Sequence, residues 1–152
     1  MNIRKATLFD LNSLIALRLD YLKLEGSLPR EQEITVLGQL KKYFIKHIPS
    51  GDFIAILAED SGKIASAAFL VITERPAGPD FLTGRCGTVL NVLTYPEYRR
   101  QGISTQVLLA LIEEAENMEV SILDLFATPE GRRVYKKLGF QESKYTAMRM
   151  YL

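Results

Sequence analysis

The spacing of the apolar residues changes near Gly51, and this change limits the folds open to the chain. Two earlier stretches repeat apolar residues at the intervals typical of helices with one buried face. They are Leu11, Leu14, Ile15, Leu19 and Leu22, then Leu37, Leu40, Phe44 and Ile48. Two short apolar runs follow, Phe53–Glu59 and Ile64–Thr73, and Ser61-Gly62 separates them. Such runs around a turn predict a β-hairpin, so the chain is expected to combine helices with a sheet.

The remaining elements are predicted from caps, turn residues and further apolar runs. Before Gly51 they are a strand over Asn2–Ala6, a capping box at Thr7 and Asp10, a helix stop at Gly26 and a helix start at Pro29. After the hairpin come a loop over Arg75–Arg85, a central strand over Thr88–Tyr95 and a helix over Ser104–Asn117. The chain then continues with a strand over Val120–Ala127, a helix from Pro129 to Gly139 capped by Thr128, and a last strand over Lys144–Leu152. The strand–helix–strand units require some parallel pairing, whereas the hairpin is antiparallel. The predicted class is α/β: a mixed, mainly antiparallel central sheet flanked by helices, in the order β-α-α-β-β-β-α-β-α-β.

Composition excludes several classes of protein. A chain of 152 residues is the size of one domain, expected to span 1–152. No apolar run is long enough to cross a membrane, and no signal peptide is visible, so a cytoplasmic protein is expected. Nineteen basic residues against 18 acidic ones argue against nucleic-acid binding by charge alone. With one cysteine and one histidine, neither an internal disulfide nor a Cys/His zinc site is expected.

The segment Asn91–Thr105 carries the clearest chemistry. A strand ends, a loop rich in Arg, Gln and Gly follows, and a helix begins. A helix start offers unpaired N–H groups and the positive end of the helix dipole, so it attracts anions. Gly102 lets the backbone approach a ligand closely, and Arg99 and Arg100 add positive charge. These residues favour a phosphate or pyrophosphate, but neither a P-loop nor a dinucleotide-binding glycine motif is present. A solvated basic turn before an ordinary helix is the alternative.

Two motifs resemble those of the GNAT N-acetyltransferase superfamily. Arg99-Arg100-Gln101-Gly102-Ile103-Ser104 looks like the family signature Arg/Gln-x-x-Gly-x-Gly/Ala, with Ser104 at the usual Gly or Ala. Thr128–Phe140 is similar to the later Asn-x-x-Ala-x-x-x-Tyr-x-x-x-Gly-Phe pattern at its Tyr, Gly and Phe. Thr128 stands at the usual Asn and Gly131 at the usual Ala. The resemblance implies a GNAT-like acyl-CoA N-acyltransferase fold and an acyltransferase of class EC 2.3.1.-.

The resemblance also implies acetyl-CoA as cosubstrate, without a metal. Its pyrophosphate would bind the segment Arg99, Arg100, Gln101, Gly102, Ile103, Ser104 and Thr105. Its pantetheine arm would run beside Val92, Leu93 and Thr94, in a splay between this strand and the next, with Thr128 nearby. The backbone N–H near Leu93 would polarise the thioester carbonyl, as in an oxyanion hole.

By the same resemblance, Tyr135 matches the family's general acid, which protonates the leaving thiolate. A phenol stays protonated at neutral pH and can donate. The alternative is a tyrosine whose ring packs under the sheet. Glu97 is a weak candidate for the general base; Asp124, a water held by Asn91, or a water chain are others. His47 and Cys86 are interpreted as a helix-end histidine and a small residue at a strand start.

The resemblance implies that the acetyl group moves by direct transfer to a primary amine. The acceptor is a small molecule, a peptide N-terminus or a protein lysine, and it is expected to enter near the loops 24–31 and 75–85. A coenzyme-binding sensor without catalysis is the alternative, which a Tyr135→Phe comparison would test. A small nucleotide-binding domain is a third, which ATP or NAD binding would support. A homodimer through the sheet edge is left open.

Overall fold

The computed structural model describes all 152 residues and contains a five-stranded sheet in the order β1-β2-β3-β4-β5. The strands are β1 (Asn2–Lys5), β2 (Phe53–Asp60), β3 (Lys63–Glu74), β4 (Arg85–Thr94) and β5 (Ile122–Asp124). Neighbouring strands are antiparallel except for the parallel pair β4–β5. The hairpin turn is at Ser61-Gly62, where both residues have positive φ angles of 50° and 81°, the backbone of a tight two-residue turn. The mixed, mainly antiparallel sheet is confirmed.

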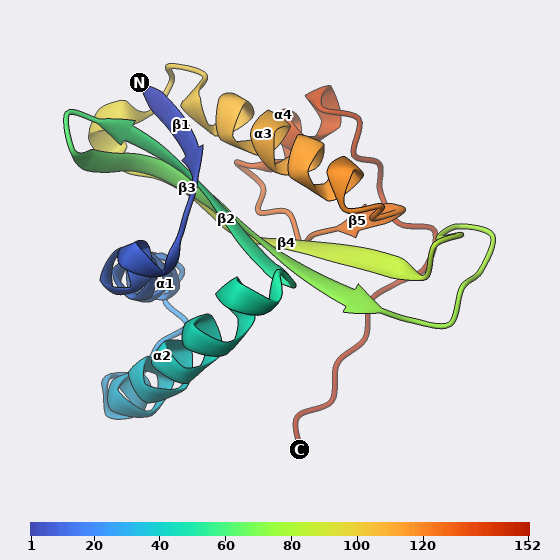
Figure 1. Cartoon of the computed structure of the whole chain (residues 1–152), viewed down its shortest axis with the longest axis horizontal. Coiled ribbons are helices and arrows are strands. Elements are labelled where there is room, and N and C mark those ends of the chain that lie inside the picture. The colour runs from blue at the N-terminus through green and yellow to red at the C-terminus, as the bar shows by residue number, and fades with distance from the viewer.

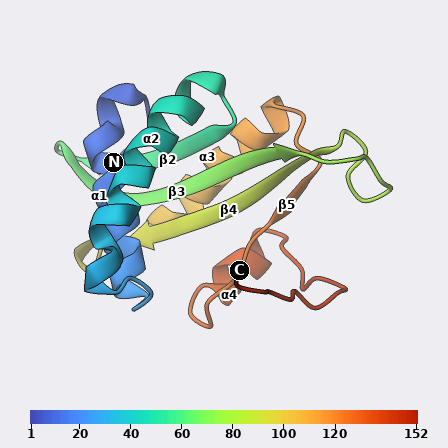
Figure 2. The same ribbon diagram turned by 90° about the horizontal axis from the view of Figure 1, so that it is seen from below.

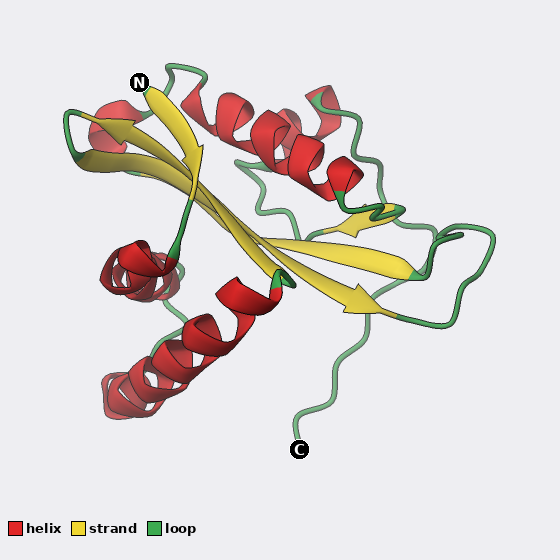
Figure 3. Cartoon of the chain, viewed as in Figure 1, coloured by secondary structure: helices red, strands yellow, loops and turns green.

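Helices cover both faces of the sheet (Figure 1). The helices α1 (Leu11–Leu24) and α2 (Glu33–Ser50) lie on one face, and α3 (Ile103–Asn117) lies on the other. The short α4 (Arg132–Lys137) follows β5. Figure 3 shows how the red helices enclose the yellow sheet. None of the helices is both long enough and apolar enough to span a membrane.

Most predicted boundaries agree with the structure because local signals determine them. The Thr7 hydroxyl accepts from the Phe9 amide and Asp10 accepts from the Thr7 amide, which completes the capping box. On α2, Leu40 and Phe44 are buried as expected, but Leu37 is exposed. The helix therefore presents a narrower apolar stripe than its sequence suggested.

Three predictions in the C-terminal third are wrong. The helix predicted from Pro129 to Gly139 is confined to Arg132–Lys137, because Thr128–Gly131 form a turn in which Gly131 donates to Thr128. The strand predicted over Val120–Ala127 is confined to Ile122–Asp124, because only these residues pair with β4. The strand predicted over Lys144–Leu152 is not formed, and the segment pairs with no other strand. The observed order ends at α4. An alternating apolar pattern specifies a strand only when a neighbouring strand accepts its hydrogen bonds, and here none does.

Candidate active site

The sheet opens along β4. Its first half pairs with β5 through Cys86–Thr88, and the pairing stops at Thr88 opposite Asp124. The strand β4 continues to Thr94, still paired with β3, whereas the segment after β5 turns away towards α4. The splay expected between these two strands is therefore present. It leaves the second half of β4 with one strand neighbour instead of two.

A β-bulge at Asn91 lies at this transition. Leu90 pairs with Phe69 and Leu93 with Ala67, so β4 carries one extra residue there. Asn91 has a positive φ of 57° and is buried. Its amide donates to the Leu17 carbonyl at 3.3 Å, and its Oδ1 accepts from Arg18 at 3.4 Å. These contacts direct the side chain towards α1, and the water-holding role considered for Asn91 lacks support.

The bulge reverses the faces of the side chains that follow it. Val89 belongs to the core beneath α3, whereas Leu93, an even number of residues later, belongs to the core beneath α1 and α2. The reversal places Val92 against the α3 side. A chain without the extra residue would present the opposite side chains to the gap.

The main-chain groups of β4 alternate in direction after the bulge. The Leu93 carbonyl accepts from the side-chain hydroxyl of Ser66 in β3 at 2.8 Å. The Tyr95 N–H donates to the Ala65 carbonyl of β3 at 3.0 Å. The N–H and C=O of one residue point to the same side of a strand, and that side changes with each residue. Leu93 therefore directs its N–H towards β3. Val92 and Thr94 direct theirs into the gap, which shifts the oxyanion candidate away from Leu93.

The loop after β4 ends at an exposed helix start. Gly102 adopts a left-handed φ of 73° directly before α3, and a Cβ there would meet nothing within 4 Å. The first helical hydrogen bond joins the Gln106 N–H to the Gly102 carbonyl at 3.2 Å. The amides of Ile103, Ser104 and Thr105 therefore have no partner within the helix. Such a group of free N–H donors is suited to an anion.

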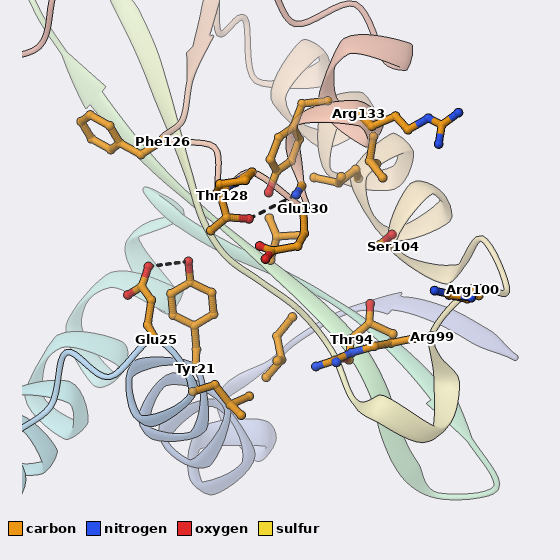
Figure 4. A pocket seen from close by; sticks show the side chains of 18 residues that line it. Tyr21, Glu25, Thr94, Arg99, Arg100, Ser104, Phe126, Thr128, Glu130 and Arg133 are labelled. Atoms are coloured by element: carbon orange, nitrogen blue, oxygen red, sulfur yellow. Dashed lines mark hydrogen bonds between the residues drawn. The ribbon is translucent and has the colours of Figure 1, made fainter.

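A cavity of about 990 Å³ joins the gap to the helix start (Figure 4). Its lining comes from α1, the second half of β4, the start of α3 and the segment from Phe126 into α4. The residues are Tyr21, Leu24, Glu25, Val92, Leu93, Thr94, Arg99, Arg100, Ser104, Leu108, Phe126, Thr128, Pro129, Glu130, Gly131, Arg133, Val134 and Tyr135. Arg99 is held across the end of β4 by its Nε, which donates to the Thr94 carbonyl at 3.1 Å.

Tyr135 lines the cavity from α4. Burial, with a smaller contribution from nearby Tyr21, raises the pKa of the Tyr135 phenol to about 12. The phenol is therefore protonated at neutral pH and able to donate. Gly131 leaves room for the ring, since a Cβ there would lie 3.0 Å from Tyr135 Cε2. Thr128 fixes the turn before α4 by accepting from the Gly131 N–H at 3.2 Å, but it does not cap the helix as predicted, because Gly131 is at the N-cap position.

Most of the residues predicted for the site lie around this cavity. Those that line it are Val92, Leu93, Thr94, Arg99, Arg100, Ser104, Thr128 and Tyr135. The side chain of Ile103 is in the core, and Gln101, Gly102 and Thr105 are outside the lining. The base candidate Glu97 is exposed and does not line the cavity, and Asp124 lines a separate, smaller one.

The cavity also contains Tyr21 and Glu130, which sequence reasoning missed, and Glu25, which is placed beside the loop 24–31. Tyr21 and Glu25 lie on one side of the opening, where the phenol donates to the carboxylate at 3.1 Å, and Glu130 lies on the other (Figure 4). The loop 75–85, expected beside the acceptor entrance, does not line the cavity, because it joins the far ends of β3 and β4 (Figure 2). Only the folded chain brings α1 beside the turn that precedes α4.

Comparisons with known proteins agree with this geometry. Residues 17–140 match the model of the acetyltransferase (GNAT) family. A predicted acetyltransferase of Clostridium acetobutylicum, solved with acetyl-CoA, is 31% identical and superposes with a TM-score of 0.87, covering 97% of this chain and 95% of that one. The aminoglycoside N-acetyltransferase AAC(6')-Iy, solved with CoA, shares the fold at 16% identity and a TM-score of 0.74, covering 99% of this chain and 93% of that one.

A curated relative matches over a shorter segment. The uncharacterized N-acetyltransferase ycf52 of Pyropia yezoensis is 36% identical over 53 residues, which is 35% of this chain and 30% of that protein. The matched segment thus spans less than a third of that relative's length.

Proposed function

The chain belongs to the acetyltransferase (GNAT) family, and from this premise we propose that it transfers the acetyl group of acetyl-CoA to a primary amine. One observation carries the proposal. The unpaired half of β4 and the free amides at the start of α3 face the same cavity. Acetyl-CoA contains an extended chain with amide groups, which could pair with the free side of β4. It also contains a pyrophosphate, which could accept from the free amides at the start of α3. The acetyl-CoA bound to the Clostridium relative supports the assignment.

The chain geometry orders the contacts along the coenzyme. The pyrophosphate would accept from the main-chain amides of the segment 99–105, with Arg99 and Arg100 adding charge. The pantetheine arm then runs back along β4 towards the bulge, past the Thr94 N–H. Val92 lies farther from the helix start than Thr94, so its N–H is the donor we assign to the thioester oxygen. This assignment replaces Leu93, whose N–H faces β3.

Tyr135 is assigned as the general acid. The acceptor amine first loses a proton to solvent water. Its nitrogen then attacks the thioester carbon, and the carbonyl oxygen gains negative charge that the Val92 N–H stabilises. The carbon–sulfur bond then breaks, and the thiolate takes the proton of the Tyr135 hydroxyl. The raised pKa of this phenol keeps that proton in place until the thiolate forms. The proton lost by the amine restores the acid through solvent.

The distribution of charge around the cavity indicates how the acceptor enters. Arg99 and Arg100 are at the helix-start end, whereas Tyr21, Glu25 and Glu130 surround the opposite opening (Figure 4). A protonated amine is attracted to two carboxylates and repelled by the arginines. We therefore assign the acceptor opening to the acidic end, between α1 and the turn before α4.

Calorimetric titration with acetyl-CoA tests the proposal, with ATP and NAD as controls. Saturable binding at one site to acetyl-CoA alone is expected, followed by acetylation of at least one member of an amine panel. Absence of acetyl-CoA binding contradicts the proposal. Binding without turnover of any amine would indicate a sensor, and binding of ATP or NAD instead would indicate a nucleotide-binding domain.

A further inference from the structure

We propose that Arg18 of α1 binds the carboxylate of the acceptor, and that the acceptor is therefore a free α-amino acid; this rests on the proposed acetyl transfer. Arg18 is half-buried at the face where α1 packs on β4. It forms no ion pair with any carboxylate of the chain. The fold thus leaves a positive charge near the cavity without a counter-ion.

The charge of Arg18 is costly in this position. Burial lowers the pKa of its guanidinium, and Tyr21 and Glu25, the groups that raise it, offset this only in part. Its side-chain partner is Asn91, whose Oδ1 accepts from Nη1 at 3.4 Å, a long hydrogen bond. A guanidinium stays charged in a protein, so partial burial without a carboxylate is unfavourable. A carboxylate from a ligand would supply the counter-ion and accept two parallel N–H bonds.

The other N–H groups of Arg18 are accessible to such a ligand. Every fully buried side-chain nitrogen or oxygen of the chain has a hydrogen-bond partner. The Nε and Nη2 atoms of Arg18 have no partner within the chain, so neither of them is fully buried. A guanidinium carries five N–H donors, and most of those of Arg18 are therefore free to bind a ligand.

Arg18 lies between the cavity and the reacting end of β4. Tyr21, which lines the cavity, follows it by three residues and so shares its side of the helix. The guanidinium lies 6.0 Å from the centre of the Tyr21 ring. On β4, its partner Asn91 directly precedes Val92, whose N–H we assign to the thioester oxygen. An α-amino acid has its amine and carboxylate on one carbon, so a carboxylate held by Arg18 keeps the amine beside the thioester.

The order of charges along α1 suits a zwitterion. Glu25 is at the acceptor opening opposite Glu130 (Figure 4), and Arg18 is seven residues earlier, about 10 Å along the helix axis. An α-amino acid can place its carboxylate on the inner guanidinium and its protonated amine towards the outer carboxylates. A peptide N-terminus and a protein lysine have no carboxylate beside the reacting amine. The arrangement therefore favours the free amino acid over both.

Acetylation of the common protein amino acids and of their carboxamides tests the proposal. A carboxamide keeps the amine and the side chain, removes the negative charge, and resembles a peptide N-terminus. The two amines differ in basicity, so the quantity compared is the ratio of kcat/KM for an amino acid to kcat/KM for its carboxamide. This ratio should fall at least about tenfold in Arg18→Gln, through a higher KM for the amino acid. The Kd for acetyl-CoA should not change.

Two further variants complete the experiment. Arg75→Gln removes an exposed arginine that does not line the cavity, and it should leave the ratio unchanged. Arg18→Lys keeps the charge without the planar fork and should retain part of the preference. If Arg18→Gln does not bind acetyl-CoA, the comparison depends on Arg18→Lys.

The outcomes separate this proposal from the acetyl transfer itself. An equal loss for amino acids and carboxamides in Arg18→Gln would mean that Arg18 only supports the bulge at Asn91, which overturns the proposal. So would an unaltered chain that acetylates carboxamides but no free amino acid. Absence of acetyl-CoA binding, or of acetylation of any amine, would instead contradict the proposed function.

Discussion

The two halves of β4 differ in what their hydrogen bonds do. The first half, through Thr88, lies between β3 and β5 and uses its main-chain groups on both sides. The second half, from Val92 to Thr94, pairs with β3 alone and presents its other side to a cavity. The difference arises where the neighbouring strand ends.

The first half of β4 is expected to contribute to folding stability, and the second half to ligand binding and turnover. Unpaired main-chain groups are costly when buried, so a fold leaves them free only where solvent or a ligand satisfies them. The bulge at Asn91 lies between the halves and is held by Leu17 and Arg18 of α1. Changes in the first half, which is paired on both sides and is here called the closed half, should therefore alter the free energy of unfolding. Changes around the second half, which is paired on one side and is here called the open half, should alter binding or turnover.

The largest effect is expected for Tyr135→Phe, beside the open half. Loss of a general acid lowers kcat about 10²–10⁴-fold, equivalent to about 3–5 kcal/mol in the activation barrier. The ring and its packing against Phe140 remain, since only the hydroxyl is removed. Steady-state kinetics and calorimetry should show a lower kcat with an unchanged Kd for acetyl-CoA.

Tyr145→Phe, in the exposed C-terminal segment Lys144–Leu152, is the matched control for loss of a tyrosine hydroxyl. It should leave kcat unchanged. If Tyr135→Phe also leaves turnover unchanged, Tyr135 is not the acid and its ring has a packing role only.

The next largest effect is expected for Gly87→Val, in the closed half. A Cβ at Gly87 would lie 2.6 Å from Leu123 of β5 and 2.8 Å from Leu70 of β3. The added side chain forces the strands apart, and overpacking of this kind costs about 1–3 kcal/mol of folding free energy. Urea denaturation should show the loss. Gly38→Ala on α2, where nothing lies within 4 Å of the new Cβ, should not destabilise the chain.

The comparison also explains which parts of the fold were predictable. Caps, turns and periodic apolar stripes are local, and they predicted β1 to β4, α1 to α3 and the capping box at Thr7 correctly. The length of β5 and the conformation of the C-terminal segment Lys144–Leu152 depend on which strand lies alongside, which no local signal records. This segment has the pattern of a strand but pairs with no strand in this structure.

The candidate site divides in the same way. The loop before α3 and Tyr135, which line the cavity, were accessible from sequence because their motifs are contiguous. The N–H direction of Leu93 was not accessible, because it depends on the bulge and on pairing with β3. Tyr21 and Glu130 were missed because they are far apart in sequence and meet only across the cavity.

A smaller effect is expected for Gly102→Glu, at the end of the open half. The carboxylate would face the amides that we assign to the pyrophosphate, and the side chain would occupy the path of the ligand. The Kd for acetyl-CoA should rise at least about tenfold, or about 1.4 kcal/mol, by calorimetry. Gly102→Ala adds the same left-handed strain without charge and should weaken binding less. Equal affinities of all three proteins would place the phosphates elsewhere.

The smallest effect is expected from pH. Burial disfavours the charged phenolate, so the pKa of Tyr135 rises to about 12, and the hydroxyl keeps its proton as pH increases past 10. With this pKa about 99% of the acid remains protonated at pH 10, whereas an ordinary phenol would be about half ionised there. The value of kcat at saturating substrates should thus show no decline between pH 7 and 10. If kcat of the unaltered chain falls by about half by pH 10, the phenol of Tyr135 is solvated and is not buried as it is in the structure.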